Sequence, residues 1–79
     1  MKNCKVEFDY SRLLGRIVER FGSRRAFCAA AGMREAILSS RTCNRSDFKD
    51  QEIYRFCEPD LLDIKDDDVV AYFFTPKVR

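Results

Sequence analysis

Residues 23–42 read SRRAFCAAAGMREAILSSRT, and this stretch decides the fold. Ser23 has a hydroxyl that can cap a short helix over 24–31, which is rich in small residues. Gly32 then stands where a left-handed residue ends a helix, and a further helix is predicted over 34–42. Small residues let two helices cross closely, so this order predicts a helix-turn-helix.

The order of four residues favours this interpretation over a plain helical bundle. Cys28 is small, Gly32 follows four residues later, Met33 is apolar, and Leu38 lies in the next helix. Short alanine-rich helices are also common in other bundles, so composition alone does not distinguish the two. The spacing therefore supports the prediction more strongly than the alanine content does.

Three more helices are predicted outside this stretch. A helix over 11–21 has apolar residues along one face, and Ser11 or Asp9 can cap it. Gly15 lies inside this helix, where a glycine often allows a neighbour to pack closely. A fourth helix is predicted over 50–57 and a fifth over 66–72. The residues expected to point inward are Tyr10, Leu13, Leu14, Ile17, Val18, Phe21, Phe48, Ile53, Phe56, Cys57, Leu61, Leu62, Ile64, Val69, Val70 and Phe73.

These elements predict one all-α domain over residues 1–79. We expect a compact bundle of about five short helices, with a short N-terminal arm over 1–8 and an extended C-terminal tail over 73–79. Pro76 excludes a helix in that tail. The three aspartates at 66–68 suit a helix N-terminus. They lack the alternating ligand spacing of a calcium loop, so we expect no metal there.

Composition excludes several classes of function. The chain is 46% hydrophobic and 35% charged, and it has no apolar run of the roughly 20 residues that a membrane span needs. We expect no membrane association and, since no signal peptide is recognisable, a cytoplasmic location. The four cysteines, of which no two are closer than 14 residues, lack the paired spacing of a zinc site. They are Cys4, Cys28, Cys43 and Cys57.

The absence of histidine removes the commonest general base and metal ligand. A cysteine nucleophile would lack its usual base, so we expect no enzyme activity, no cofactor and no small-molecule substrate. We expect reduced cysteines, with Cys28 and Cys57 packed as small apolar residues.

The charges are distributed unevenly along the chain. Residues 12–45 contain eight arginines, no lysine and two glutamates, a net charge of +6, whereas residues 46–79 have a net charge of −4. Arginine suits phosphate groups and base edges better than lysine does. This asymmetry predicts one surface that meets a polyanion. Arg12, Arg16 and Arg20 are spaced four apart and are expected to solvate the first helix.

Three further stretches complete a pattern that covers most of the chain. They are FDYS at 8–11, FGS at 21–23 and YFFTPKV at 72–78. In this order around the predicted helix-turn-helix, the chain resembles the small repressor and Cro-like helix-turn-helix proteins of phages and prophages. The resemblance covers about residues 8–78 and implies a lambda-repressor-like fold. Three residues depart from the family pattern: Cys28 replaces alanine, Arg34 replaces a capping serine or threonine, and Thr42 replaces leucine.

The resemblance implies a function in transcription. The helix over 34–42 would enter the major groove of double-stranded DNA, and the protein would act as a regulator in a bacterial host cell, associated with the nucleoid. The residues expected to contact bases are Arg34, Glu35, Ala36, Ser39 and Ser40. The residues expected to contact phosphates are Arg24, Arg25, Arg41 and Arg45.

Two questions stay open from the sequence. Regulators of this kind mostly bind two half-sites as homodimers, and the candidate dimer contacts are Phe73, Phe74 and Val78. The same tail would equally suit a cover over the protomer's own core. The second question is whether the helix-turn-helix binds a protein instead of DNA, as an antirepressor or a phage inhibitor of host defence would. The acidic Glu35 and the uncapped Arg34 favour that alternative.

Overall fold

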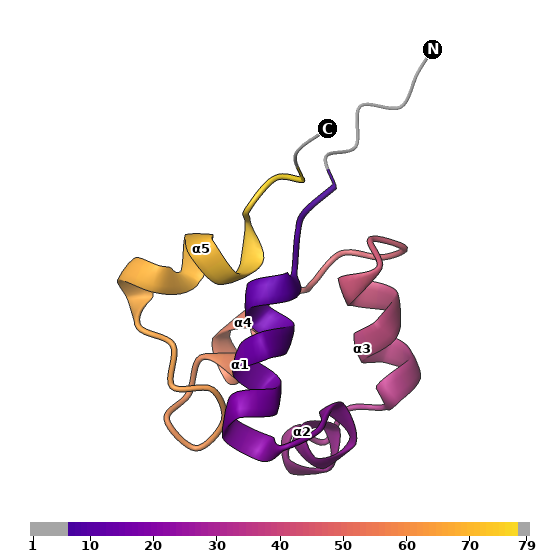
Figure 1. The fold of residues 1–79 in the computed structure, drawn as a ribbon, viewed down its shortest axis with the longest axis vertical. Helices are drawn as coiled ribbons and strands as arrows, with labels where there is room; N and C mark the ends of the chain where they lie inside the picture. Colours follow the sequence, from indigo (N-terminus) through magenta and orange to yellow (C-terminus); the bar gives the residue numbers. More distant parts are fainter. Residues whose placement is uncertain (1–6, 78–79) are drawn as a thin grey trace.

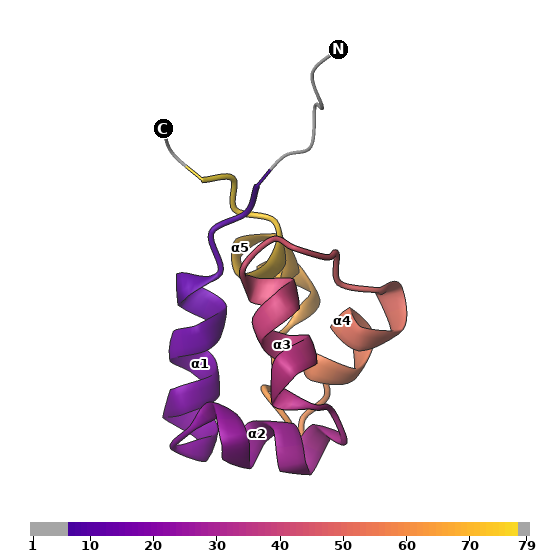
Figure 2. The same ribbon diagram turned by 90° about the vertical axis from the view of Figure 1, so that its right-hand side faces the viewer.

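The computed structural model describes residues 7–77, which fold into five α-helices and one 3-10 turn. Figure 1 shows α1 in the middle of the bundle, α2 across one end, and α3 and α5 on opposite sides of α1. In Figure 2, α3 lies in front, between α1 and α4. The prediction of an all-α bundle is therefore confirmed. The elements are α1 (Ser11–Phe21), α2 (Arg24–Ala31), α3 (Glu35–Thr42), α4 (Asp50–Phe56), η1 (Asp66–Asp68) and α5 (Val69–Phe73).

The first two helices have the predicted bounds, and the other three differ from prediction at their ends. Helix α3 begins at Glu35 because Arg34 has the extended backbone of an N-cap residue, with φ −75° and ψ 144°. Helix α4 ends at Phe56, one residue earlier than expected, and Cys57 is its C-cap. The three aspartates form a separate 3-10 turn before α5.

Of the two residues predicted to cap α1, Asp9 is the one whose side chain binds its start. The N-cap residue of this helix is Tyr10, whose side chain makes no capping hydrogen bond. Asp9, the residue before Tyr10, supplies the side chain that accepts the first N–H of the helix. Its carboxylate accepts hydrogen bonds from the Ser11 backbone N–H, at 2.9 Å, and from the Ser11 hydroxyl, at 2.7 Å.

The turn between α2 and α3 is tight because Gly32 adopts a left-handed conformation. Its φ is 71°, and the N–H groups of Gly32 and Met33 both donate to the Cys28 carbonyl oxygen. These hydrogen bonds satisfy the end of α2, as a left-handed glycine cap does. At the start of α2, the Ser23 hydroxyl accepts a hydrogen bond from the Ala26 N–H at 3.1 Å, as predicted.

Aromatic side chains hold the helices together. Phe27 of α2 meets Phe56 of α4 edge to face, with ring centroids 4.8 Å apart and an angle of 84° between the ring planes. Phe73 of α5 packs on Phe56, and Phe48 from the α3–α4 loop contacts both. Tyr10 packs against Phe48 in turn. The core therefore joins α2, α4, α5, the segment before α1 and the α3–α4 loop through one connected set of rings.

All but two of the predicted inward residues are buried or partly buried. Val18 is 50% exposed and Val70 is 65% exposed. The fully or nearly fully buried set is Tyr10, Leu13, Ile17, Phe27, Cys28, Leu38, Phe56, Leu61, Leu62, Ile64 and Phe73. Cys57 is partly buried, so two of the described cysteines pack as apolar residues.

Arg16 and Arg20 do more than solvate α1, which corrects the expectation for two of the three arginines in that row. Arg16 donates to the carbonyl oxygens of Leu62 and Asp63, at 2.9 and 3.3 Å. Arg20 donates to the carbonyl oxygens of Leu61 and Pro59, both at 3.0 Å. These bonds hold the irregular segment after α4 against α1. Its backbone carbonyls thereby gain partners that a helix would otherwise supply.

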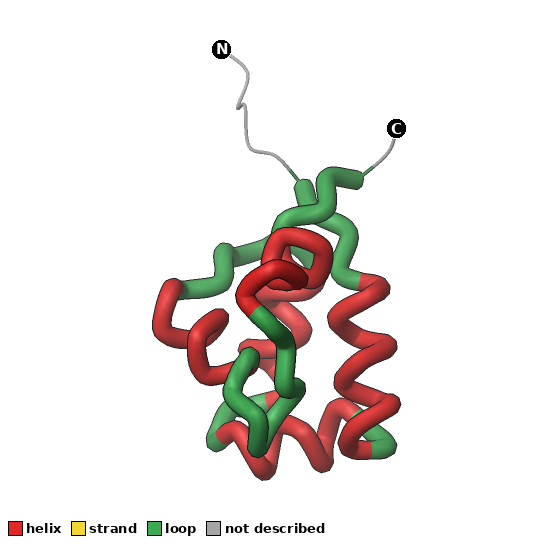
Figure 3. The backbone as a smooth tube through the Cα atoms, turned by 90° about the vertical axis from the view of Figure 1, so that its left-hand side faces the viewer, coloured by secondary structure: helices red, strands yellow, loops and turns green. Residues whose placement is uncertain are grey.

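The described ends of the chain pair with each other. Phe8 and Pro76 form an antiparallel bridge, flanked by hydrogen bonds from the Asp9 N–H to the Thr75 oxygen and from the Lys77 N–H to the Glu7 oxygen. Figure 3 shows the two segments meeting at one end of the bundle. The described part of the tail after α5 therefore lies against the protomer's own N-terminal segment.

This pairing changes the candidate dimer contacts. Phe73 is 1% exposed and belongs to α5 and the protomer's core, so the tail starts one residue later than predicted and Phe73 cannot contact a second subunit. Phe74 is 42% exposed and packs edge to face on Phe8. Val78 lies outside the described residues.

Residues 7–77 lack two features, one of membrane proteins and one of metal sites. Within this range, no helix has the length and apolar character that crossing a membrane requires. In the same range, no group of three or more cysteine and carboxylate side chains is arranged to hold a metal ion.

Gly15 has no close neighbour, contrary to expectation. A Cβ atom built on this residue would meet nothing within 4 Å, and its φ is not positive. Gly22 also has open space around it, but its φ is 84°. The two glycines therefore differ in backbone conformation and not in packing.

We predict that alanine has opposite effects at these two positions. Gly15→Ala should raise the free energy of unfolding by about 0.5–1 kcal/mol, because alanine loses less backbone entropy in a helix. Gly22→Ala should lower it by about 1–2 kcal/mol, because a Cβ strains the left-handed conformation. Thermal unfolding of both variants measures the difference. A lower melting temperature for Gly15→Ala would show that this glycine has a role that its surroundings do not reveal.

Candidate nucleic-acid interface

The outer face of α3 is open to solvent. Glu35, Ala36 and Ser39 are exposed, while Leu38 on the other side of the helix is 1% exposed and anchors it to the core. Residues three or four apart lie on one side of a helix. Three of the five predicted base contacts therefore share one exposed strip, which we call the α3 strip.

Arg34 stands at the beginning of this strip. Its carbonyl oxygen accepts hydrogen bonds from the N–H groups of Ile37 and Leu38, both at 3.1 Å, but its side chain makes no capping bond. The side chain is exposed, at the positive end of the helix dipole. Glu35 next to it compensates that dipole. The guanidinium is therefore presented where α3 meets solvent and is not used to start the helix.

Ser40 differs from the other predicted base contacts. It is half-buried, and its hydroxyl lies 2.9 Å from the Ser46 hydroxyl, with which it shares a hydrogen bond. This bond turns Ser40 toward the α3–α4 loop. Ile37, which the sequence did not place, is 37% exposed and borders the α3 strip.

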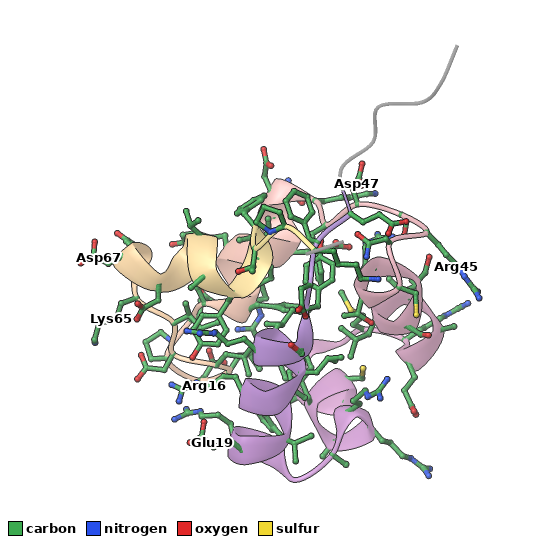
Figure 4. All side chains as sticks on the ribbon, turned by 45° about the horizontal axis from the view of Figure 1, so that its top comes forward. Arg16, Glu19, Arg45, Asp47, Lys65 and Asp67 are labelled. Carbon is green, nitrogen blue, oxygen red and sulfur yellow. The ribbon has the colours of Figure 1, made fainter. Side chains whose placement is uncertain are left out.

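Three of the four predicted phosphate contacts are exposed. Arg24 and Arg25 open α2, and Arg45 lies in the loop after α3. Figure 4 shows the Arg45 side chain extending away from the body of the protein beside α3. Positive charge is therefore exposed on the helix before α3 and in the loop after it.

Arg41, the fourth predicted phosphate contact, is already engaged within the protein. Its Nε and Nη2 atoms donate to the two carboxylate oxygens of Glu52 in α4, both at 2.9 Å, and its Nη1 donates to the Ser46 hydroxyl at 2.6 Å. The Arg41 side chain is 13% exposed and that of Glu52 is 19% exposed. We therefore assign Arg41 to the junction between α3 and α4 and not to the exposed surface.

This ion pair also orders the start of α4. Glu52 Oε1 accepts the Lys49 backbone N–H at 2.9 Å, so one carboxylate binds both the arginine and a free donor of its own helix. The Arg41 guanidinium lowers the pKa of Glu52, and the Lys49 N–H lowers it further. The hydrogen bonds to Glu52 raise the pKa of Arg41. Both groups are charged at neutral pH.

Asn44 is a residue that sequence reasoning missed. It has a φ of 64°, a left-handed conformation that asparagine tolerates better than most residues. Its side-chain oxygen accepts the Phe8 N–H at 2.9 Å, and its side-chain nitrogen donates to the Phe8 carbonyl at 3.0 Å. The loop after α3 is thereby tied to the paired ends of the chain. The only signal in the sequence was an asparagine in a polar loop.

The comparison with protein families covers this whole site. The sequence model of a family described as "Protein of unknown function (DUF739)" matches residues 6–76, which include all the helices described above. No curated protein matches the chain. The matched residues include the α3 strip, but the description of the family gives the strip no function.

We predict that the Arg41–Glu52 pair stabilises the protein in a pH-dependent way. Because the folded-state pKa of Glu52 is lowered, its contribution is present above the carboxylate's ordinary pKa and is lost as the pH falls through the folded-state value. Glu52→Gln should therefore lower the free energy of unfolding by about 1–3 kcal/mol at neutral pH. The difference in free energy of unfolding between Glu52→Gln and the natural protein should shrink in acid, where Glu52 itself becomes protonated. Urea unfolding across this pH range measures the effect.

Glu58→Gln is the matched control. Glu58 pairs with Arg55 at 2.6 Å, but both side chains are more than a third exposed. An exposed pair contributes about 0–1 kcal/mol, so this variant should change little. Equal losses for the two variants would show that burial does not distinguish the pairs.

Proposed function

Since the chain belongs to the DUF739 family, whose description assigns no function, we propose a function from the site itself: sequence-specific binding of double-stranded DNA as a transcriptional regulator. The regulator would be of the phage repressor and Cro-like kind that the sequence resembles, and it would act at the nucleoid of a bacterial host cell. The observation that carries the proposal is the exposed α3 strip, together with exposed arginines on α2 and in the loop after α3.

The turn between α2 and α3 supports α3 as the reading helix of a helix-turn-helix. Leu38 and the buried residues of α2 hold the inner side of the pair, which leaves the outer side of α3 free. A helix of this kind fits the major groove of B-form DNA, where base edges are distinguishable. α2 would then cross the sugar-phosphate backbone.

Each residue of the α3 strip suits a particular part of a base pair. Arg34 can donate two hydrogen bonds to guanine, Glu35 can accept one from cytosine, and Ala36 can contact the methyl group of thymine. Ser39 can donate to a base or a phosphate. Ser40 contributes less, because its hydroxyl is bonded to Ser46.

Phosphate binding would come from Arg24, Arg25 and Arg45. Residues 12–45 have a net charge of +6, and the three side chains are exposed on α2 and in the loop after α3. Such contacts set the orientation on the duplex without reading its sequence. Arg41 is left out of this set because Glu52 and Ser46 already bind it.

One α3 strip reads few base pairs, so we propose that two protomers bind adjacent half-sites as a homodimer. Of the three residues expected at the contact, the half-exposed Phe74 is the candidate that remains among the described residues. No catalysis and no cofactor are part of this proposal.

One observation favours a protein partner as the second candidate function. A cleft of about 420 Å³ lies between the α2–α3 turn and α4, next to the α3 strip. Its lining includes Met33, Arg34, Ile37, Gln51 and Phe56. An exposed isoleucine beside such a cleft suits an apolar side chain of another protein. The affinity for a DNA duplex distinguishes the two candidate functions.

We predict that binding to a duplex weakens steeply as salt rises, with a slope of log K against log salt near −0.9 for each phosphate neutralised. Arg45→Ala should weaken binding to all sequences alike and flatten the slope by about one. Arg41→Ala should leave the slope unchanged, because its guanidinium is bound to Glu52. Mobility titrations at several salt concentrations measure the slopes, and the stoichiometry of the same complex reports whether two protomers bind.

Lys65→Ala is the control for this experiment. Figure 4 places Lys65 near η1 and α5, on the side of the protein away from Arg45. Its removal should therefore leave the slope unchanged. A duplex affinity too weak to measure even at low salt would contradict DNA binding and favour the protein-binding alternative.

We predict that Arg34→Ser separates stability from recognition. Serine should cap α3, where Arg34 makes no capping bond, and raise the free energy of unfolding by about 1 kcal/mol. The same change should relax specificity at one base pair per half-site, worth about 1–3 kcal/mol of discrimination. Arg34→Lys should keep the charge and still lose most of the discrimination, because it lacks the forked donors of arginine.

Thermal unfolding and selection of binding sites from random DNA measure these two effects. An unchanged selected sequence with evenly lower affinity would make Arg34 a phosphate contact. No change in either affinity or sequence would remove Arg34 from the interface.

A further inference from the structure

The surface between α4 and α5 is hollowed in two places. Two adjoining hollows of about 270 and 230 Å³ share Tyr54, Cys57 and Asp66 in their walls. Tyr54 is 74% exposed, the most exposed large apolar side chain among residues 7–77. Val70, on α5, is 65% exposed. We call this surface the α4–α5 groove.

The groove faces away from the α3 strip. On α4, Glu52 is turned toward α3 by its ion pair with Arg41. Tyr54 follows two residues later, about 200° further around the helix. It therefore lies on the opposite side of α4 from α3, so a molecule in the groove would leave the α3 strip uncovered.

Negative charge surrounds the groove. Three carboxylates line the two hollows, Asp50, Glu58 and Asp66, and neither lining contains a lysine or an arginine. Asp50 and Asp66 are exposed at the two hollows, and Figure 4 shows Asp67 on the side of the protein opposite Arg45. A phosphate backbone would be repelled here, so the groove does not suit a nucleic acid.

The floor of the groove is apolar. Ile53, Cys57 and Val69 are partly buried and line the first hollow, and the buried Ile64 lines the second. Burial, with a smaller effect of the Asp66 charge, raises the pKa of the Cys57 thiol. The thiol is therefore neutral at physiological pH, and the floor accepts an apolar side chain.

We propose that the α4–α5 groove binds a short segment of another protein in which apolar residues are flanked by lysine or arginine. The apolar residues would pack on the floor beside Tyr54, an amino acid enriched among residues that dominate binding energy. The basic residues would pair with Asp50 and Asp66, so the partner must carry positive charge next to its apolar residues. The proposal is independent of DNA binding, because the two surfaces lie on opposite sides of α4.

The test uses a fluorescent amphipathic peptide of leucine and lysine, about 14 residues long, and a twin in which glutamate replaces lysine. The lysine peptide should bind the full chain with a dissociation constant of about 10–100 μM, and the glutamate twin should not bind. Backbone NMR spectra of the labelled protein should show shifts confined to residues 50–70. Shifts on α3, or equal binding of the twin, would overturn the proposal.

Variants in the groove test its residues. Tyr54→Ser and Asp66→Lys should each weaken the lysine peptide at least about tenfold. Val18→Ser and Glu19→Lys, which make the same kinds of change at exposed positions on α1, should leave its affinity unchanged. DNA mobility of Tyr54→Ser should equal that of the natural protein.

Two outcomes contradict the proposal whatever the result of the DNA experiments. One is an unchanged peptide affinity in both groove variants. The other is self-association that Tyr54→Ser abolishes, which would make a second copy the occupant of the groove.

Discussion

The contact between Phe27 and Phe56 is the interaction on which the rest of the structure depends. Phe27 is 0% exposed and Phe56 is 1% exposed, and their rings meet edge to face. The contact joins α2 to α4, and Phe48 and Phe73 then pack around Phe56. In a chain of 79 residues the core is small, so a few large rings supply much of its buried area. The buried Leu38 fixes the inner side of α3 to this core, and the α3 strip on the other side of the helix therefore faces solvent.

Arginine performs three physical tasks in this protein. Arg16 and Arg20 donate to backbone carbonyls of the segment after α4. Arg41 joins α3 to α4 through Glu52, and Arg34 and Arg45 are exposed beside the α3 strip. A planar guanidinium with five donors suits bonds to backbone carbonyls, the bidentate pair with a carboxylate and contacts made from the surface. The +6 charge of residues 12–45 therefore overstates the positive charge that is free at the surface, because Arg16, Arg20 and Arg41 are bound within the protein.

How far sequence reasoning reached differs between the helices and the site. The caps at Ser23, Gly22 and Gly32 depend on neighbours in sequence, and α1 and α2 have the predicted bounds for that reason. Glu35, Ala36 and Ser39 were expected at the surface only because of the family resemblance, and the structure places all three on the exposed side of α3. The ion pair of Arg41 was missed because its partner Glu52 is 11 residues away, on a different helix. Helical spacing cannot show such a partner.

The sequence by itself determined which segments are helical, where the tight turn falls and which half of the chain is basic, because each of these depends on local spacing and composition. Only the tertiary structure decided which charges are free. It joins Asn44 to Phe8 by hydrogen bonds, and it buries Phe73 in the core. It also pairs the segment before α1 with the tail after α5. It also leaves Tyr54 exposed beside carboxylates on the side of α4 away from α3. These outcomes depend on how helices pack, and packing joins residues that the sequence keeps far apart.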